Sequence, residues 1–194
     1  MSTPEAAAGL MPRLREATAE QHRELEAWVD PARRFATRES YTAYLLEIYA
    51  LFVDLETTLA TLPWRTISFD LDERRKAPLL EKDLRFFGLD PAAAHPPAMP
   101  LRLESLAAGF GCQYVLEGST LGGQMILAGL EKRGIGPDSG AAFFACYRER
   151  TPAMWKSFKE AATAWCADEE RVAEAIDAAR CTFVFYQRGV SPLG

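Results

Sequence analysis

The chain contains two histidines, and the first of them, His22, is placed where an imidazole could bind a metal. His22 belongs to a stripe of mostly apolar residues that repeats every three or four positions, so we expect its side chain to point toward the interior of a helical protein. Imidazole is a common axial ligand of the iron in a tetrapyrrole. Glu26 follows one helical turn later and could accept a hydrogen bond from the other ring nitrogen. A core histidine that merely bonds a neighbour is the alternative.

A second motif, YVLEGSTLGGQ at residues 114–124, places three glycines inside a stretch that otherwise predicts a helix. Each glycine in a helix interior costs about 0.5–1 kcal/mol relative to alanine. Gly118 and Gly122 are four residues apart and share one face, with Gly123 beside them. The glycines could let another helix approach closely, or they could let a flat ligand lie against the helix backbone. The second explanation would make a haem sandwich with His22, and the spacing alone does not choose between the two.

The other histidine and the cysteines give weaker signals. His95 lies in the Pro-rich sequence AHPPAMP, and we interpret it as an exposed loop residue. The four cysteines lack a CxxC or other close metal-ligand spacing, which argues against a zinc site and against disulfides. We therefore expect reduced thiols and a cytoplasmic location. The cysteines are Cys112, Cys146, Cys166 and Cys181.

The composition is typical of a soluble globular protein. The 194 residues are 48% hydrophobic and 25% charged, and this length can bury a sizeable core. A net charge of −5 argues against a broad nucleic-acid-binding surface. The longest apolar stretch, YTAYLLEIYALFV, is short and contains Glu47, and the N-terminus lacks the pattern of a signal peptide. We expect neither a membrane span nor a nucleic-acid partner.

Apolar residues recur at helical spacing along almost the whole chain, and no segment convincingly predicts a strand. We predict an all-α fold, a single-domain helical bundle of about seven helices spanning residues 1–194, with residues 1–9 as a flexible tail. A Pro-rich loop is expected over residues 88–100. The expected helices cover about 10–28, 39–62, 74–87, 101–133, 140–149, 151–166 and 168–188.

Together, LREATAEQHRELE at residues 14–26 and YVLEGSTLGGQ at residues 114–124 resemble the haem oxygenase family, most closely its bacterial branch, including members associated with bacteriophytochromes. The resemblance extends over roughly residues 10–190 in matching helical order. It implies a haem oxygenase-like fold that binds haem b between two helices. On that basis His22 is the proximal ligand of the iron and Glu26 its hydrogen-bond partner, and the glycines that lie over the haem are Gly118, Gly122 and Gly123.

The resemblance also assigns residues around the rim of the haem pocket. Arg15, seven residues before His22, matches a basic position of the family, and Tyr114 is a further candidate partner of the propionates. Lys156 and Lys159 resemble a basic pair on a later helix, and Phe183 falls at a pocket-lining aromatic position. For each of them an ordinary solvated charge, or plain core packing of the aromatic ring, is the alternative.

One position departs from the family pattern. Many haem oxygenases have Asp immediately after the first distal glycine, where it orders the water that delivers protons, but this chain has Ser119. A serine hydroxyl can hold a water molecule but carries no charge at neutral pH. The departure leaves the route of proton delivery unassigned.

The resemblance implies oxidative cleavage of haem to biliverdin, carbon monoxide and ferrous iron, with dioxygen as co-substrate and haem as both substrate and cofactor. GSTLGGQ is not a dinucleotide-binding motif, so an external ferredoxin or NAD(P)H-dependent reductase is expected to supply electrons, and a biliverdin-using photoreceptor is a possible partner.

Two alternative functions remain. The chain could bind or carry haem without efficient turnover, or it could resemble the thiaminase-like enzymes, which use a nucleophilic cysteine. Cys112 and Cys146 are not well placed for that role, and we expect them to pack in the core.

Overall fold

The computed structural model describes residues 9–95 and 101–192, and within these ranges the regular structure is entirely helical. The predicted all-α fold is therefore confirmed, whereas most of the predicted N-terminal tail, residues 1–8, and the end of the predicted loop, residues 96–100, lie outside the described residues. The α-helices are α1 (Leu10–Ala17), α2 (Ala19–Val29), α3 (Pro31–Arg34), α4 (Arg38–Ala60), α5 (Ala77–Phe86), α6 (Leu106–Glu131), α7 (Ala142–Ala145), α8 (Thr151–Trp165) and α9 (Glu169–Gly189). Short 3-10 turns form at Trp64–Thr66, Asp72–Arg74, Pro91–Ala93 and Arg148–Arg150.

The first predicted helix is divided in two at Thr18, which the apolar pattern did not indicate. Thr18 leaves helical geometry, with φ −113° and ψ 6°, and its hydroxyl donates to the carbonyl oxygen of Leu14 at 2.7 Å. The short turn α3 then follows Asp30, which has a positive φ of 41°. The break lets the chain change direction between α1 and α2.

Two other predicted helices are shorter than expected, one because of a capping side chain and the other because of a backbone angle. The helix expected from residue 101 begins only at Leu106, where the Ser105 hydroxyl accepts from the backbone N–H of Ala108. The helix expected over 140–149 ends at Ala145, because Cys146 adopts a φ of 31° that a helix cannot continue.

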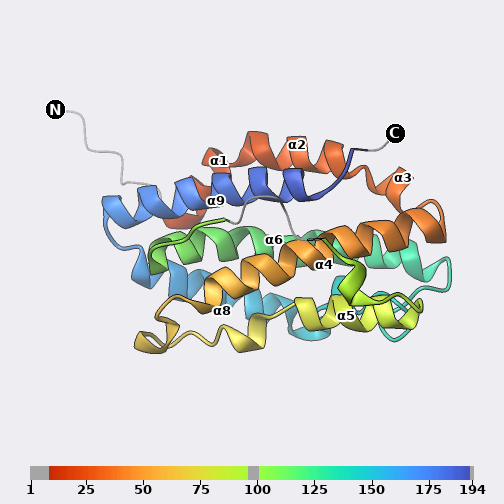
Figure 1. The fold of residues 1–194 in the computed structure, drawn as a ribbon. Helices are drawn as coiled ribbons and strands as arrows, with labels where there is room; N and C mark the ends of the chain where they lie inside the picture. The colour runs from red at the N-terminus through yellow and green to blue at the C-terminus, as the bar shows by residue number, and fades with distance from the viewer. Residues whose placement is uncertain (1–8, 96–100, 193–194) are drawn as a thin grey trace.

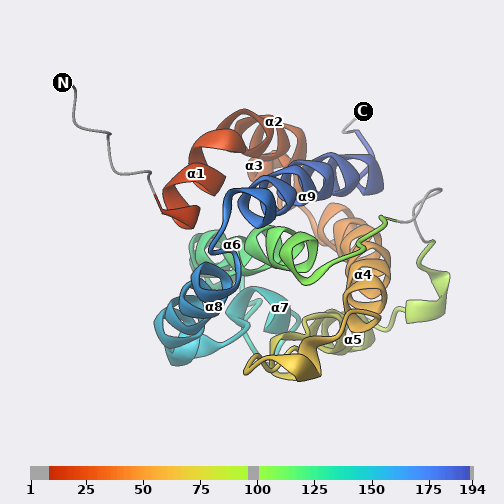
Figure 2. The ribbon, with the colours of Figure 1, turned by 90° about the vertical axis from the view of Figure 1, so that its left-hand side faces the viewer.

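Helix α6 is the central element, and the other helices pack around it (Figure 1). Seen end-on, α6 lies in the middle, with α1, α2 and α9 on one side and α4, α5, α7 and α8 around the rest (Figure 2). The backbones of α6 and α9 approach so closely that a Cβ at Gly111 would lie 2.0 Å from the carbonyl oxygen of Ala175. No helix within the described ranges is long and apolar enough to cross a membrane.

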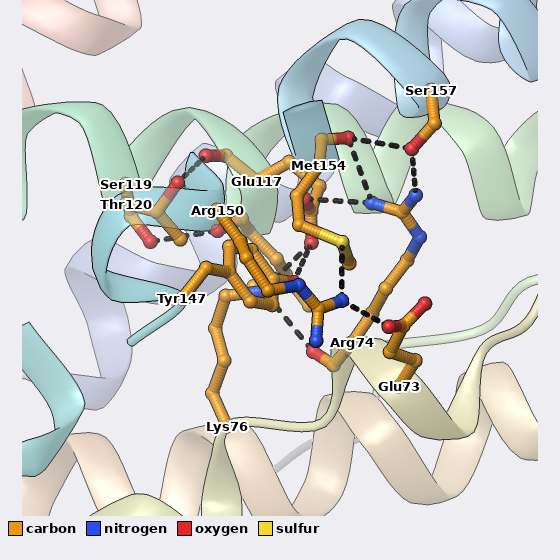
Figure 3. A network of polar contacts seen from close by, with 11 residues as sticks. Glu73, Arg74, Lys76, Glu117, Ser119, Thr120, Tyr147, Arg150, Met154 and Ser157 are labelled. Carbon is orange, nitrogen blue, oxygen red and sulfur yellow. Dashed lines mark hydrogen bonds and ion pairs between the residues drawn. The ribbon is translucent and has the colours of Figure 1, made fainter. Parts of the chain in front are cut away.

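A buried ionic network fixes α6 at Glu117, one residue before Gly118 (Figure 3). The Glu117 carboxylate is 1% exposed and accepts hydrogen bonds from Arg74 at 2.9 Å, from Lys76 at 2.8 Å and from the Tyr147 hydroxyl at 2.7 Å. Arg74 also donates to the Ser157 hydroxyl on α8 at 2.8 Å. Buried charges with these partners tie α6, α8 and the segment before α5 into one unit. The glycine face of α6 is thereby held in a fixed orientation.

Asp83 of α5 should make stability depend on pH in a direction opposite to most carboxylates. It accepts from the backbone N–H groups of Ala142 and Phe143 at 2.7 and 2.9 Å, but burial raises its pKa to about 6. Because the folded state then binds its proton more tightly than the unfolded state, this group favours folding below pH 4 and loses that contribution as pH rises through about 6. Urea unfolding of the wild type and Asp83→Asn from pH 4 to 7 checks this. The stability advantage of the wild type should shrink over this range, and a constant difference would contradict the assignment.

Candidate functional site

A cavity of about 1030 Å³ lies between α2 and α6, and one wall is closed by α9. Figures 1 and 2 show α2 running alongside α9, with both helices on the same side of α6. Most of the lining is apolar, and the mouth includes Leu121 and Met125, which are 43% and 82% exposed. Large apolar side chains left open to solvent at a cavity mouth are typical of a surface that a ligand covers.

His22 lies on the α2 wall of this cavity. Its side chain is 57% exposed and its ring meets the ring of Phe183 edge-on, with centroids 5.9 Å apart. The expectation of a core position is therefore corrected: the stripe on α2 faces a cavity, and the alternative of a core histidine is wrong. The Nδ1 atom lies 3.5 Å from Oε2 of Glu26, which brings the predicted pair together. Nε2 is the nitrogen that this contact leaves for a ligand.

The glycines of α6 form the opposite wall, and their surroundings decide between the two explanations for them. A Cβ placed on Gly118 or Gly122 would have no atom of another segment within 4 Å, so no helix packs against either position. Gly129 is open in the same way and also lines the cavity. Gly123 differs, because its Cβ would lie 3.3 Å from the carbonyl oxygen of Phe144. Close packing thus explains Gly123, whereas Gly118 and Gly122 leave a flat backbone surface facing the cavity.

Ser119 and Tyr114 also line the cavity, at different places along α6. The Ser119 hydroxyl donates to the carbonyl oxygen of Leu116 at 2.8 Å, so its proton is already used within the helix. Tyr114 is half-buried beside Trp155. Burial raises the pKa of Tyr114, while a hydrogen bond to Thr18 and the charge of Arg15 lower it. Tyr114 and Arg15 therefore both line the cavity and lie near one another.

The structure does not bring the predicted lysine pair to the cavity. The residue of α8 that lines the cavity is Trp155. Lys156 is exposed, and its Nζ atom lies 3.8 Å from Oε1 of Glu160. Lys159 is not among the described residues that line the cavity. Two arginines that the sequence analysis missed do line the cavity, Arg23 on α2 and Arg133 just after α6. Arg133 follows Gly122 by eleven residues, which is three helical turns, so its position on the glycine face was a usable signal.

Positively charged side chains outnumber negatively charged ones in the lining of the cavity. Arg15, Arg23 and Arg133 line it with no carboxylate partner among the described residues, whereas the acidic residue in the lining, Glu26, lies beside His22. Uncompensated guanidinium groups at the rim of an apolar cavity suit a flat ligand that carries carboxylates at its edge.

The described residues support neither a metal site built from several side chains nor a nucleophilic cysteine. The described residues contain no cluster of three or more His, Cys, Asp or Glu side chains that could hold a metal ion, so His22 is a lone imidazole. The part of the lining that the structure describes includes no cysteine, and burial raises the pKa of Cys112 to about 12 and of Cys146 to about 11. Neither thiol is a ready nucleophile, which removes the basis for the thiaminase-like alternative. The remaining histidine, His95, is exposed in a loop, as expected.

Comparison with known proteins gives a consistent result across sequence and structure. The family model described as "Heme oxygenase" matches residues 8–191. A haem oxygenase of Xanthomonas campestris pv. campestris is 30% identical over 148 residues, which are 76% of this chain and 87% of that protein. The NO- and CO-bound haem oxygenase of Neisseria meningitidis superposes with a TM-score of 0.80 at 23% identity, covering 95% of this chain and 94% of the other. Haem oxygenase 2 of Chlamydomonas reinhardtii gives a TM-score of 0.74 at 19% identity, covering 93% and 95% of the two chains. With a cavity of matching chemistry between α2 and α6, the chain belongs to the haem oxygenase family.

Proposed function

We propose that this protein cleaves haem oxidatively to biliverdin, carbon monoxide and ferrous iron. The observation that carries the proposal is the placement of His22 across the cavity from Gly118 and Gly122, whose missing side chains leave their backbone open. A planar macrocycle would fit between these walls, with its iron toward the imidazole and its carboxylates toward the arginines. Haem supplies the iron at which dioxygen is reduced, and it is itself the molecule that is oxidised.

His22 and Glu26 would hold the macrocycle from one side. With Glu26 beside Nδ1, the imidazole would present Nε2 to the iron. The edge-on contact with Phe183 limits rotation of the ring. These contacts would make His22 an oriented nitrogen ligand.

The glycine wall would admit the macrocycle and keep its other face dry. At Gly118 and Gly122 the helix backbone itself forms the surface, so any side chain added there would occupy the space of the ligand. Leu121, Met125 and Ile126 border this surface with apolar atoms, which would pack on a bound macrocycle and shield it from bulk water. The reaction would therefore proceed in a confined space in which a small oxygen-containing ligand has few orientations.

Electrons must come from outside the chain, because its residues include no redox cofactor motif. We propose an external ferredoxin or NAD(P)H-dependent reductase as the donor. The resemblance of both motifs to bacteriophytochrome-associated members favours a biliverdin-using photoreceptor as the recipient of the product.

A haem carrier without turnover is the second candidate, and the position of Ser119 favours it because its proton is used within α6. One experiment separates the two. The haem-loaded protein is mixed with ascorbate or a reductase under air and its absorbance is followed. Loss of the Soret band with formation of biliverdin supports the enzyme, and lasting bands of the ferrous dioxygen complex without biliverdin support the carrier.

The three cavity arginines should each strengthen binding of the haem carboxylates. Exposed ion pairs are worth about 0.2–1 kcal/mol, so Arg15→Gln, Arg23→Gln and Arg133→Gln should each weaken haem affinity by roughly two- to fivefold. Arg65, which is exposed and lies away from the cavity, provides the control Arg65→Gln.

Haem dimethyl ester tests the cause of the effect, because it has the same shape without the negative charges. The variants and the wild type should bind the ester equally in fluorescence-quenching titrations. An equal loss for haem and for its ester would show that these arginines act through packing rather than charge.

A further inference from the structure

Two tyrosine hydroxyls meet in the wall of the cavity where α4 approaches α9. Tyr44 and Tyr186 are 4% and 5% exposed, both line the cavity, and their hydroxyl oxygens are 3.2 Å apart. Around them the wall consists of aromatic rings: Phe35 packs edge-on against Tyr44, and Phe143 and Phe144 complete the surface. The hydroxyl pair is therefore a polar spot in an otherwise aromatic part of the cavity.

A count of protons shows that this spot has an unused hydrogen-bond donor. The two hydroxyls carry two protons, and the hydrogen bond between them uses one. Within the described residues neither hydroxyl has a second hydrogen-bond partner. The nearby guanidinium of Arg34, 5.4 Å from the centre of the Tyr44 ring, can only donate. Buried donors are rarely left without an acceptor, so the second proton is available to a molecule in the cavity.

The pair also lies in the part of the wall that connects the two sides of the proposed haem site. Tyr186 follows Phe183 by one turn of α9, and Phe183 contacts the ring of His22. Phe144, on the other side, is the residue whose backbone packs beneath Gly123 of the glycine wall. A small polar ligand held between His22 and the glycines would face this wall.

We propose that the Tyr44–Tyr186 pair donates a hydrogen bond to a water-sized polar ligand held in the cavity, and so acts as a positioning element for it. This inference rests on the proposed function, since the ligand occupies the space that haem leaves. Ser119 does not fill the role, because its hydroxyl proton goes to the carbonyl oxygen of Leu116. Burial raises the pKa of Tyr44 to about 12 and raises the pKa of Tyr186 well above its usual value, so both remain neutral phenols that can donate. The pair would anchor a water or another small oxygen-containing ligand at this wall of the cavity.

Azide binding to the haem-loaded protein tests the inference, because azide is a small anion that accepts hydrogen bonds. The double variant Tyr44→Phe/Tyr186→Phe keeps both rings and removes both hydroxyls. We expect its azide affinity to fall roughly tenfold, the worth of a hydrogen bond to a charged acceptor. The infrared stretching band of bound azide should also shift, because it responds to hydrogen bonding and not to general stability.

Tyr41→Phe is the matched control. Tyr41 is equally buried on α4, but its hydroxyl donates to the carbonyl oxygen of Gly140 at 2.7 Å and lies outside the cavity lining. This variant should lose stability and keep the azide affinity and band of the wild type. If the double variant folds poorly, the single variants Tyr44→Phe and Tyr186→Phe are compared by the infrared band alone.

Unchanged azide affinity and an unchanged band in the hydroxyl-free protein would overturn the inference. That result leaves the proposed function intact if the wild type binds and cleaves haem. A wild type that fails to bind haem would instead remove the proposed function.

Discussion

His22→Ala should bind haem without an axial histidine, with a changed Soret band and an affinity at least ten- to a hundredfold lower. Loss of a group that merely orients a metal ligand already costs about that much, and here the ligand itself is removed. Because the His22 side chain is 57% exposed, the variant should keep the stability of the wild type. Absorbance titration with haem and thermal unfolding of the haem-free protein measure the two effects.

Two additions make this test specific. His95→Ala removes the other histidine, which is exposed in a loop, and should change neither the Soret band nor the affinity. Imidazole added to His22→Ala should restore the wild-type spectrum, because the removed side chain leaves room for it on the cavity wall. A wild-type spectrum in His22→Ala without added imidazole would show that another group binds the iron.

Gly118→Leu and Gly122→Leu should weaken haem binding without lowering the stability of the haem-free protein. At both positions a new side chain meets no other segment, and leucine has a helix propensity about 0.8–1 kcal/mol better than glycine. The haem-free variants should therefore unfold at the same or a higher urea concentration than the wild type. Overfilling the ligand space should nevertheless weaken haem binding by about ten- to a hundredfold.

Gly111→Ala provides the contrast within the same helix. A Cβ there would lie 2.0 Å from the carbonyl oxygen of Ala175, so α6 and α9 would have to separate. This smaller substitution should destabilise the protein strongly. If Gly122→Leu instead lost stability and retained its affinity for haem, the glycine face would be a packing surface and the proposed site would be misplaced.

The comparison of these glycines shows what the sequence could and could not predict. Periodicity placed Gly111, Gly118 and Gly122 on one helix, but the reason for each glycine depends on what lies opposite, which is a tertiary property. Likewise, no proline or glycine marks the division of the first helix at Thr18, where the backbone leaves helical geometry. The helical fold class needed only local patterns, and it was predicted correctly.

Within the candidate site, the residues predicted best are those carried by a local motif. His22 and Glu26 are one turn apart and the structure places them 3.5 Å apart. The Tyr44–Tyr186 contact joins residues 142 positions apart and has no local signal. Lys156 and Lys159 were predicted wrongly as cavity residues. Their approximate positions along α8 matched the family pattern, but such a match does not fix which face of the helix each side chain occupies.

A crystal structure of the haem-loaded protein would test the central claim most directly. We predict that Nε2 of His22 binds the iron, and that the backbone of α6 from Gly118 to Gly122 lies in van der Waals contact with the opposite face of the macrocycle. Haem held by another residue, or haem bound with the glycine face of α6 turned away from it, would contradict the account.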